Sequence, residues 1–182
     1  MSKVYDALDQ DLRDFIQRQH LFFVGTAPAA GGHINISPKG ADSFRVLGDK
    51  RVAYLDMTGS GIETVAHLKD NGRIVLMFCA FNGPARILRL YGTGTPHEKE
   101  SAAFKDLMPQ FTHLPGARAI IDVAIDRIAT SCGFGIPVYE LKGERDQLQR
   151  WAVSKGEAGI DEYLAERNAA SIDGLPGYSG KT

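Results

Sequence analysis

The stretch RIVLMFCAFNGPARILRLYGTG, residues 73–94, contains two apolar segments separated by Asn82-Gly83-Pro84. Both segments are rich in β-branched, aromatic and other apolar residues, and the three residues between them are strong turn formers. We therefore expect two long antiparallel strands, residues 73–81 and 85–94, joined by a tight turn.

Working outward from this hairpin, further strands are expected over residues 21–27, 33–37, 51–56 and 118–130, with a short one over 44–47. In the last long strand Ile121, Val123 and Ile125 share one face, while Asp122 and Asp126 occupy the other. Helical spacing is expected over residues 3–19, 62–71 and 104–111, and again in a polar tail from residue 143. Strands and helices do not alternate strictly, which excludes a doubly wound sheet. The pattern predicts an α+β, mainly β, fold with about six antiparallel strands and flanking helices.

Composition limits the classes of function. The chain has 182 residues, enough for one domain, and its formal net charge of −1 gives no field that would attract nucleic acid or an anionic membrane. Its two cysteines cannot build a disulfide framework. No apolar run approaches the ~20 residues that span a bilayer, and the first residues lack the basic and apolar segments of a signal peptide. We expect a cytoplasmic protein that binds neither nucleic acid nor membrane.

The turn Thr58-Gly59-Ser60-Gly61 stands between an expected strand and an expected helix. Its glycines let backbone amides converge, its hydroxyls can donate hydrogen bonds, and the helix adds a partial positive charge, so the turn suits a phosphate monoester. The alternative is an ordinary strand-to-helix turn with Thr58 or Ser60 as the N-cap. Taken alone, the ordinary turn is favoured.

Two further segments carry cations. Asn35-Ile36-Ser37-Pro38-Lys39-Gly40 ends a strand with a lysine that could hold an anion, or could form a solvated turn. Arg86 and Arg89 are three residues apart within one expected strand, so we expect them to face opposite ways. A packed arginine requires an anionic or dipolar partner, either a ligand or a carboxylate of the protein.

The sequence contains no recognisable motif for a metal site, a dinucleotide site or a serine nucleophile. The five histidines are scattered without metal-ligand spacing, so no metal site is expected. There is no dinucleotide fingerprint, and no serine in the Gly-x-Ser-x-Gly pattern of a nucleophile elbow.

Taken in order, five blocks resemble the pyridoxamine 5′-phosphate oxidase-like family. The resemblance covers roughly residues 10–142 and rests on the order and spacing of the blocks: Asn35-Ile36-Ser37-Pro38, Val52 to Asp56, the Gly/Ser turn with its helix, Asn71 to Phe78, and Arg86 to Gly92. It implies a six-stranded antiparallel split β-barrel that dimerises and binds FMN at the dimer interface. Some members of the family bind the deazaflavin F420 instead, and others bind haem.

Carried over by position, the resemblance implies which residues contact the cofactor. The strand along the flavin and its phosphate contributes Asn35, Ile36, Ser37 and Lys39. The strand and turn facing the ribityl chain and the phosphate contribute Tyr54, Asp56, Thr58, Gly59 and Ser60. The strand near the ring contributes Arg86 and Arg89, of which we assign Arg86 to the pyrimidine edge of the flavin and Arg89 to a carboxylate outside the barrel or across the dimer.

The sequence also departs from the family's pattern. Glu63-Thr64 stand near the place of an Arg-Lys pair that grips the FMN phosphate, Ile87 replaces a glutamine, and the C-terminal Arg-x-His pattern is absent. Vitamin B6 oxidation is therefore not expected. The sequence predicts an FMN-dependent oxidoreductase acting on a small organic substrate, without a protein nucleophile. The alternatives are a flavin, F420 or haem carrier without turnover, and a cofactor-free barrel that binds a partner.

We expect one domain over residues 1–182: a helix in 1–20, the barrel in 21–142 and a helical tail in 143–182.

Overall fold

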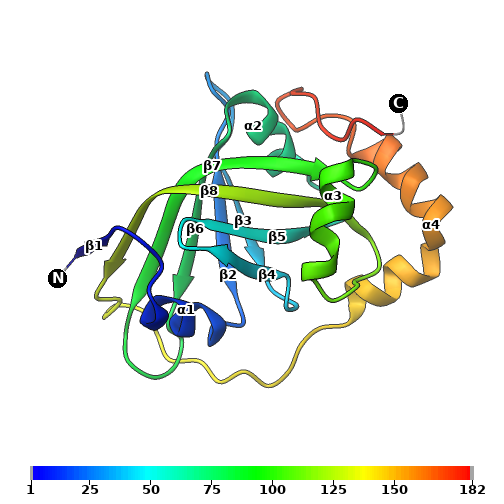
Figure 1. Cartoon of the computed structure of the whole chain (residues 1–182). Helices are drawn as coiled ribbons and strands as arrows, with labels where there is room; N and C mark the ends of the chain where they lie inside the picture. The colour runs from blue at the N-terminus through cyan, green and yellow to red at the C-terminus, as the bar shows by residue number, and fades with distance from the viewer. Residues whose placement is uncertain (1, 181–182) are drawn as a thin grey trace.

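The computed structural model describes residues 2–180, which form one strongly curved antiparallel sheet with helices around it (Figure 1). The strand order is β3-β2-β6-β7-β8-β5-β4, and β1 pairs with β8 outside this path. The strands are β1 (Lys3–Tyr5), β2 (Phe22–Thr26), β3 (Asn35–Lys39), β4 (Phe44–Gly48), β5 (Arg51–Met57), β6 (Arg73–Cys79), β7 (Ile87–Glu98) and β8 (Ala117–Ser131).

The mainly antiparallel barrel expected from the sequence is confirmed, with two differences. The sheet has eight strands where about six were expected, and it is not closed, because β3 and β4 are its unpaired edges. Besides the short strand expected over 44–47, the additional strand is β1, whose three residues lie inside the segment expected to begin the first helix.

The hairpin that decides the fold is present as β6 and β7, paired from Arg73↔Thr93 to Cys79↔Ile87. Strand β7 continues to Glu98 and pairs along β8 over almost its whole length, so these two strands span the molecule (Figure 1). A register shift between Tyr91 and Gly92 bends this pair. A side chain at Gly92 would collide with the carbonyl oxygen of Ala124, so this bend requires a glycine.

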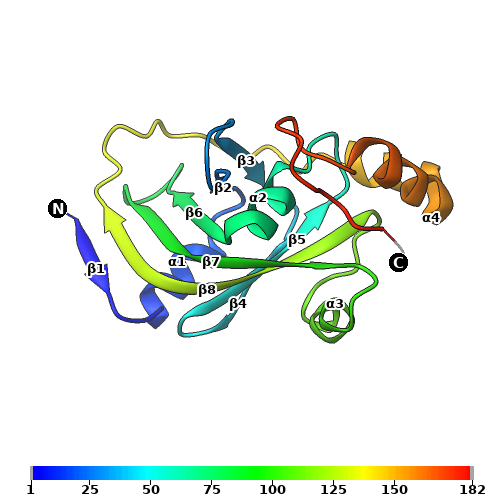
Figure 2. The ribbon, with the colours of Figure 1, turned by 90° about the horizontal axis from the view of Figure 1, so that it is seen from above.

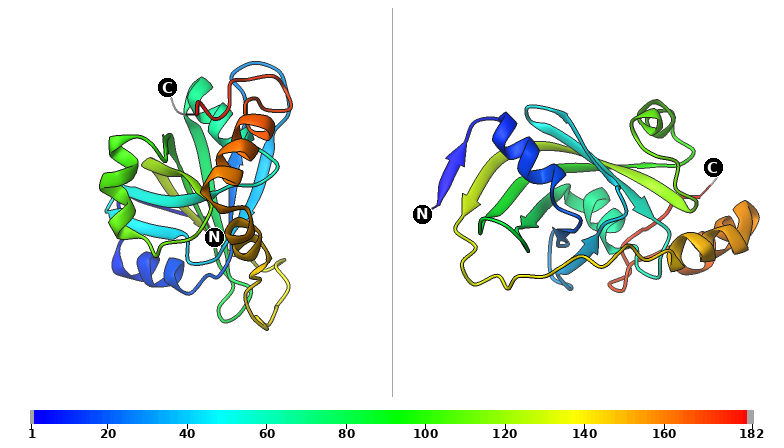
Figure 3. Two further views of the ribbon diagram at one scale, coloured as in Figure 1. Left: turned by 90° about the vertical axis from the view of Figure 1, so that its right-hand side faces the viewer. Right: turned by 90° about the horizontal axis from the view of Figure 1, so that it is seen from below.

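The helices close the ends of the barrel. Helix α1 (Gln10–Gln17) begins seven residues later than expected, because Asp9 caps it by accepting the N–H of Leu12 at 2.9 Å. It lies across the lower opening, and α2 (Glu63–Asn71) lies over the upper one (Figures 2 and 3). Helix α3 (Ala102–Leu107), with the 3-10 turn Met108–Gln110, packs outside β5 and β8.

The C-terminal part is helical only in its middle. An extended segment leads from β8 to α4 (Gln147–Arg167), which is broken at Gly156, where φ is 65°. Residues 168–180 return to α2 as a loop (Figure 1). Within residues 2–180, no helix is long and apolar enough to cross a membrane.

Two apolar clusters hold the sheet. The larger one fills the inside of the barrel, where Ile121, Val123 and Ile125 lie as their alternation predicted. The smaller one lies on the other face, where Ile120 and Leu55 pack against α3. Most of β5 and the first residues of β8 are therefore covered on both faces, and these segments carry the residues described next.

Candidate functional site

The edge strand β3 approaches β5 across the opening of the sheet. Lys39 ends β3 and Asp56 lies near the end of β5, and these strands are not hydrogen-bonded neighbours. Lys39 Nζ nevertheless donates to Asp56 Oδ1 at 2.7 Å. A side-chain ion pair therefore bridges the split in the barrel.

Asp56 is completely buried and accepts from two cations. Arg118 Nε donates to its second carboxylate oxygen at 2.8 Å. Burial by itself would raise the pKa of Asp56, but the charges of Lys39 and Arg118, together with their hydrogen bonds, lower this pKa to about 2. Asp56 is therefore an anion at neutral pH, inside the barrel.

A β-bulge directs Arg118 into this cluster. The pairing of β5 with β8 passes from Asp56↔Ala119 to Met57↔Ala117, which leaves Arg118 as the additional residue. Its guanidinium also donates to Asn168 Oδ1 at 2.6 Å, and Asn168 Nδ2 donates to the carbonyl oxygen of Gly59 at 3.0 Å. This cluster, Lys39, Asp56, Arg118 and Asn168, is called the charged cluster below. It holds two cations and one carboxylate, so its net charge is +1.

The turn before α2 lies beside the charged cluster. Thr58 is buried, and its hydroxyl oxygen has no hydrogen-bond partner among residues 2–180. Neither Thr58 nor Ser60 caps α2: the N-cap position is Ile62, and no side chain caps the helix. The ordinary N-cap interpretation of this turn is therefore wrong.

A hollow of about 350 Å³ opens above the turn. Its lining consists of His33, Ile34, Asn35, Ser60, Gly61, Glu63 and Ile172. Asp173 accepts two hydrogen bonds from His33, one from its backbone N–H at 2.8 Å and one from ring Nδ1 at 2.7 Å. These two bonds, with the charge of His33, lower the pKa of Asp173.

The side chains of β3 alternate as a strand requires. Asn35 Nδ2 donates to Thr64 Oγ1 at 3.0 Å, and Ser37 Oγ donates to Asn35 Oδ1 at 3.2 Å, so both side chains lie on the side facing α2. Ile36 points outward and is 69% exposed. The predicted contact strand therefore offers an apolar outer side, while its polar side chains bind one another.

Tyr54 lies inside the barrel. It is fully buried against Phe22, with ring centroids 5.5 Å apart, and burial raises the pKa of its phenol well above the usual value. Its hydroxyl has no partner in the described part of the chain. Asp56 shares this inward direction, so both predicted contacts on β5 belong to the interior.

Arg86 and Arg89 differ from the expected arrangement. Arg86 precedes β7, donates to Asp11 Oδ2 at 2.7 Å and lies over the Phe15 ring, 5.4 Å from its centroid. Arg89 lies on β7 and donates to Ser131 Oγ at 3.2 Å. Within this chain Arg86 therefore has a carboxylate partner and Arg89 has a hydroxyl partner, and the assignment of Arg86 to the flavin stays a prediction.

The structure thus joins Lys39, Asp56 and the 58–61 turn, and leaves both arginines of the hairpin elsewhere. Sequence reasoning missed Arg118, Asn168, His33 and Asp173. A basic residue at the start of the alternating 118–130 strand was the available signal for Arg118. His33 begins the expected 33–37 strand, but nothing local pairs it with Asp173, and Asn168 and Asp173 come from a segment without a local pattern.

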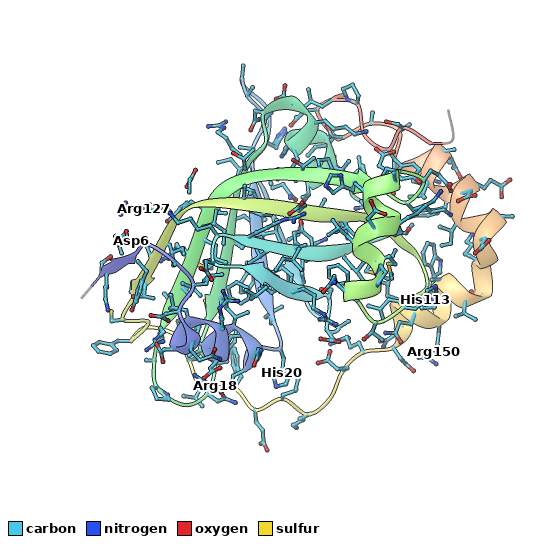
Figure 4. The ribbon with its side chains drawn as sticks, viewed as in Figure 1. Asp6, Arg18, His20, His113, Arg127 and Arg150 are labelled. Atoms are coloured by element: carbon cyan, nitrogen blue, oxygen red, sulfur yellow. The ribbon has the colours of Figure 1, made fainter. Side chains whose placement is uncertain are left out.

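Other features of the described residues offer less chemistry. A groove of about 890 Å³ runs between α1, β4 and the extended segment, with balanced charges along it. His20 lies by α1 and His113 lies near α4, at different edges of the molecule (Figure 4). Within residues 2–180, no group of three or more His, Cys, Asp or Glu side chains could hold a metal ion.

An antiparallel barrel that stays open between two of its strands places this protein in the class of split-barrel proteins. The family model for pyridoxamine 5′-phosphate oxidase matches residues 8–132, and this chain belongs to that family. A curated relative, the pyridoxamine 5′-phosphate oxidase family protein ustO of Aspergillus flavus, is 41% identical over 192 aligned positions, which cover 95% of this chain and 76% of the relative.

Solved structures agree on the fold. HupZ from Group A Streptococcus is 28% identical with a TM-score of 0.51, over 66% of this chain and 90% of that one. A candidate pyridoxamine 5′-phosphate oxidase from Lactobacillus delbrueckii is 23% identical with a TM-score of 0.54, over 69% of this chain and 98% of that one. The resemblance inferred from the sequence is confirmed.

Proposed function

We propose that this protein is an FMN-dependent oxidoreductase that acts on a small organic substrate. The observation that carries the proposal is the charged cluster, which keeps a net charge of +1 at the split of a barrel whose family the sequence match identifies. A buried excess of positive charge favours an anion beside it, and a flavin phosphate is such an anion.

The residues of the site fit the phosphate of FMN. The Lys39 side chain is 19% exposed, and its ammonium group has donors beyond the one used by Asp56. The buried hydroxyl of Thr58, in the adjoining turn, has no partner within residues 2–180. We therefore assign Lys39 to the phosphate, with Thr58 and Ser60 as hydroxyl contacts.

The remaining predicted contacts act indirectly. Asp56 and Arg118 fix the ammonium group of Lys39, and Asn35 and Ser37 stiffen β3, along which the flavin would lie. Bound flavin supplies hydride transfer, so the protein has to bind, orient and exclude water rather than provide a nucleophile. Arg89, which has no carboxylate partner among the described residues, is a candidate contact for the pyrimidine edge from a second subunit.

We propose a homodimer with the cofactor at its interface. Ile34 and Ile36 are 77% and 69% exposed beside the unpaired edge strand β3, an arrangement that a partner surface would cover. Light scattering at micromolar concentration should show a dimer, and a monomer would remove the shared-site arrangement. Both cysteines are free, which suits a reducing cytoplasm.

The test of the cofactor is the visible spectrum of the purified protein and of a Lys39→Met variant. We expect flavin absorption in the wild type, and loss of most of it in Lys39→Met after equal dialysis. Lys155→Met, an exposed change on α4, is the matched control and should keep full occupancy. Lys39→Glu would be a less informative variant than Lys39→Met, because it would place a second carboxylate against buried Asp56.

Haem is the second candidate, and one observation favours it. Asp173 orients the His33 ring through Nδ1, as carboxylates do for metal-bound histidines, and the other ring nitrogen has no partner in the described structure. A Soret band that is lost in His33→Asn would identify haem, whereas F420 would show neither this band nor the flavin spectrum.

A further inference from the structure

The first turn of α2 is the end of a helix where the backbone favours an anion. Its leading N–H groups have no partner inside the helix, and no side chain of the N-cap residue satisfies them. The first residue of this helix is Glu63. The carboxylate of Glu63 folds back over the preceding turn, since a side chain added to Gly61 would collide with Glu63 Oε2.

The C-terminal loop holds this carboxylate in place. The backbone N–H of Ile172 donates to Glu63 Oε1 at 3.3 Å. The next residue, Asp173, is tied to His33 by two hydrogen bonds. Gly32 makes this approach possible, because a side chain there would meet Asp173 Oδ2 at 2.6 Å.

The loop is itself anchored at both ends. Asn168 is fully buried and bonded to Arg118, and Lys69 Nζ donates to the carbonyl oxygen of Gly177. Between them, Ala170 and Pro176 form an antiparallel bridge. Glu63 is therefore bound to a built loop rather than to a freely moving segment.

The hollow beside Glu63 has neither lysine nor arginine in its described lining, and its one histidine, His33, is bound to Asp173. The cations close in the chain are also engaged: Lys39 and Arg118 bind Asp56, and Lys69 binds Glu98. An anion entering from this side would meet the carboxylate of Glu63 beside cationic groups that already have carboxylate partners.

We propose that Glu63 is a specificity-determining residue that keeps phosphate off the N-terminus of α2. This inference rests on the proposed function. The phosphate of FMN is then held by Lys39 and the hydroxyls of the 58–61 turn without the N–H groups of α2, and it adds less to flavin affinity than it would if the helix also bound it. The protein consequently distinguishes FMN from riboflavin less sharply than a variant that lacks the charge of Glu63 would.

The test compares FMN and riboflavin binding to the apoprotein of wild type and Glu63→Gln, by quenching of flavin fluorescence. The glutamine keeps an oxygen that accepts the Ile172 N–H and removes only the charge. We expect FMN to bind about tenfold tighter to the variant, because a like charge near the phosphate is gone, and riboflavin affinity to change less than about twofold. Glu162→Gln, an exposed neutralisation on α4, is the matched control and should change neither affinity.

Inorganic phosphate provides a readout that does not depend on flavin. In an amide NMR titration, phosphate should shift the Gly61 and α2 first-turn signals of Glu63→Gln and leave those of the wild type in place. An unchanged ratio of FMN to riboflavin affinity, in a wild type that binds flavin, overturns the inference and leaves the proposed function standing. A wild type that binds neither flavin overturns the proposed function and the inference together, even where the phosphate shifts appear.

Discussion

Tyr54 and Asp56 stand two residues apart on β5, are both fully buried and face the same interior, yet their surroundings are opposite. Tyr54 belongs to an aromatic cluster with Phe22, Phe44 and Phe78, whose ring centroids lie 5.0–5.5 Å apart. Asp56 belongs to the charged cluster. The aromatic cluster is stabilised by apolar packing, which does not require a particular direction of contact. The charged cluster is stabilised only when each partner lies at hydrogen-bond distance.

This difference shows where the barrel can accommodate change. Removing a ring from the aromatic cluster leaves neighbours that can shift towards the gap. Removing one charge from the charged cluster leaves another charge buried and unpaired, which no rearrangement of apolar groups can repair. The four predictions below test this contrast, from the largest expected effect to the smallest.

Asp56→Ala should lower the free energy of unfolding by about 3–5 kcal/mol, because Arg118, only 3% exposed, loses its carboxylate. Urea denaturation measures this loss. Asp49→Ala removes the exposed partner of Arg13 and should cost less than about 1 kcal/mol, which makes it the matched control. A loss below about 1.5 kcal/mol for Asp56→Ala would show that water reaches the cluster.

The free energy of unfolding should fall at low pH because Asp56 becomes protonated. The pKa of Asp56 is about 2 in the folded protein against 3.8 for the free group, so the unfolded chain binds the proton more readily. The contribution, about 2 kcal/mol at neutral pH, is therefore present above pH 4 and is lost as the pH falls towards 2. The contribution of Asp56 is measured by comparing the free energies of unfolding in urea of wild type and Asp56→Asn between pH 5 and pH 2, since the asparagine cannot titrate. If the two free energies fall with pH in parallel, the acid sensitivity belongs to other carboxylates.

Phe78→Leu should cost about 1–2 kcal/mol, since one ring leaves the stack with Phe22 and the edge contact with Phe44. Because no charge changes, the loss measured in urea should be the same at pH 7 and pH 3. A strongly pH-dependent loss would mean that the aromatic and charged clusters are coupled through Tyr54.

Arg86→Met should cost less than about 1 kcal/mol, because its ion pair with Asp11 is partly exposed and screened by salt. The loss should shrink further in concentrated salt. A redox titration of the same variant tests the flavin contact assigned from the sequence: a lowered flavin potential would support that contact, and a potential shift in Arg89→Met alone would move it to Arg89.

The hairpin of β6 and β7 could be predicted because its information is local: two apolar runs and three turn residues. Strand β1 could not, because Lys3, Val4 and Tyr5 form a strand only by pairing with β8, more than a hundred residues away. Its apolar residues also continued the spacing of α1, whose beginning is set instead by the Asp9 cap.

The site divides in the same way. The family resemblance predicted that Lys39 and β5 lie close together. It did not predict that Asp56 is buried beneath Lys39, because the alternation of side chains along a strand carries no information on which residues cover the end of that strand. The role of Arg118 could not be predicted, because a β-bulge changes the direction of its side chain. Asn168 and Asp173 reach the site from a loop whose contacts lie 50 and 140 residues away in the chain.

The hydrogen bond between Arg118 and Asn168 also has a consequence for synthesis. The ribosome adds the 50 residues between them in roughly 3–10 s at its usual rate. Until Asn168 has been added, the guanidinium of Arg118 lacks its amide partner and the carbonyl of Gly59 lacks its donor. The charged cluster can therefore be completed only after synthesis has passed residue 168, although all the strands of the sheet precede it in the chain.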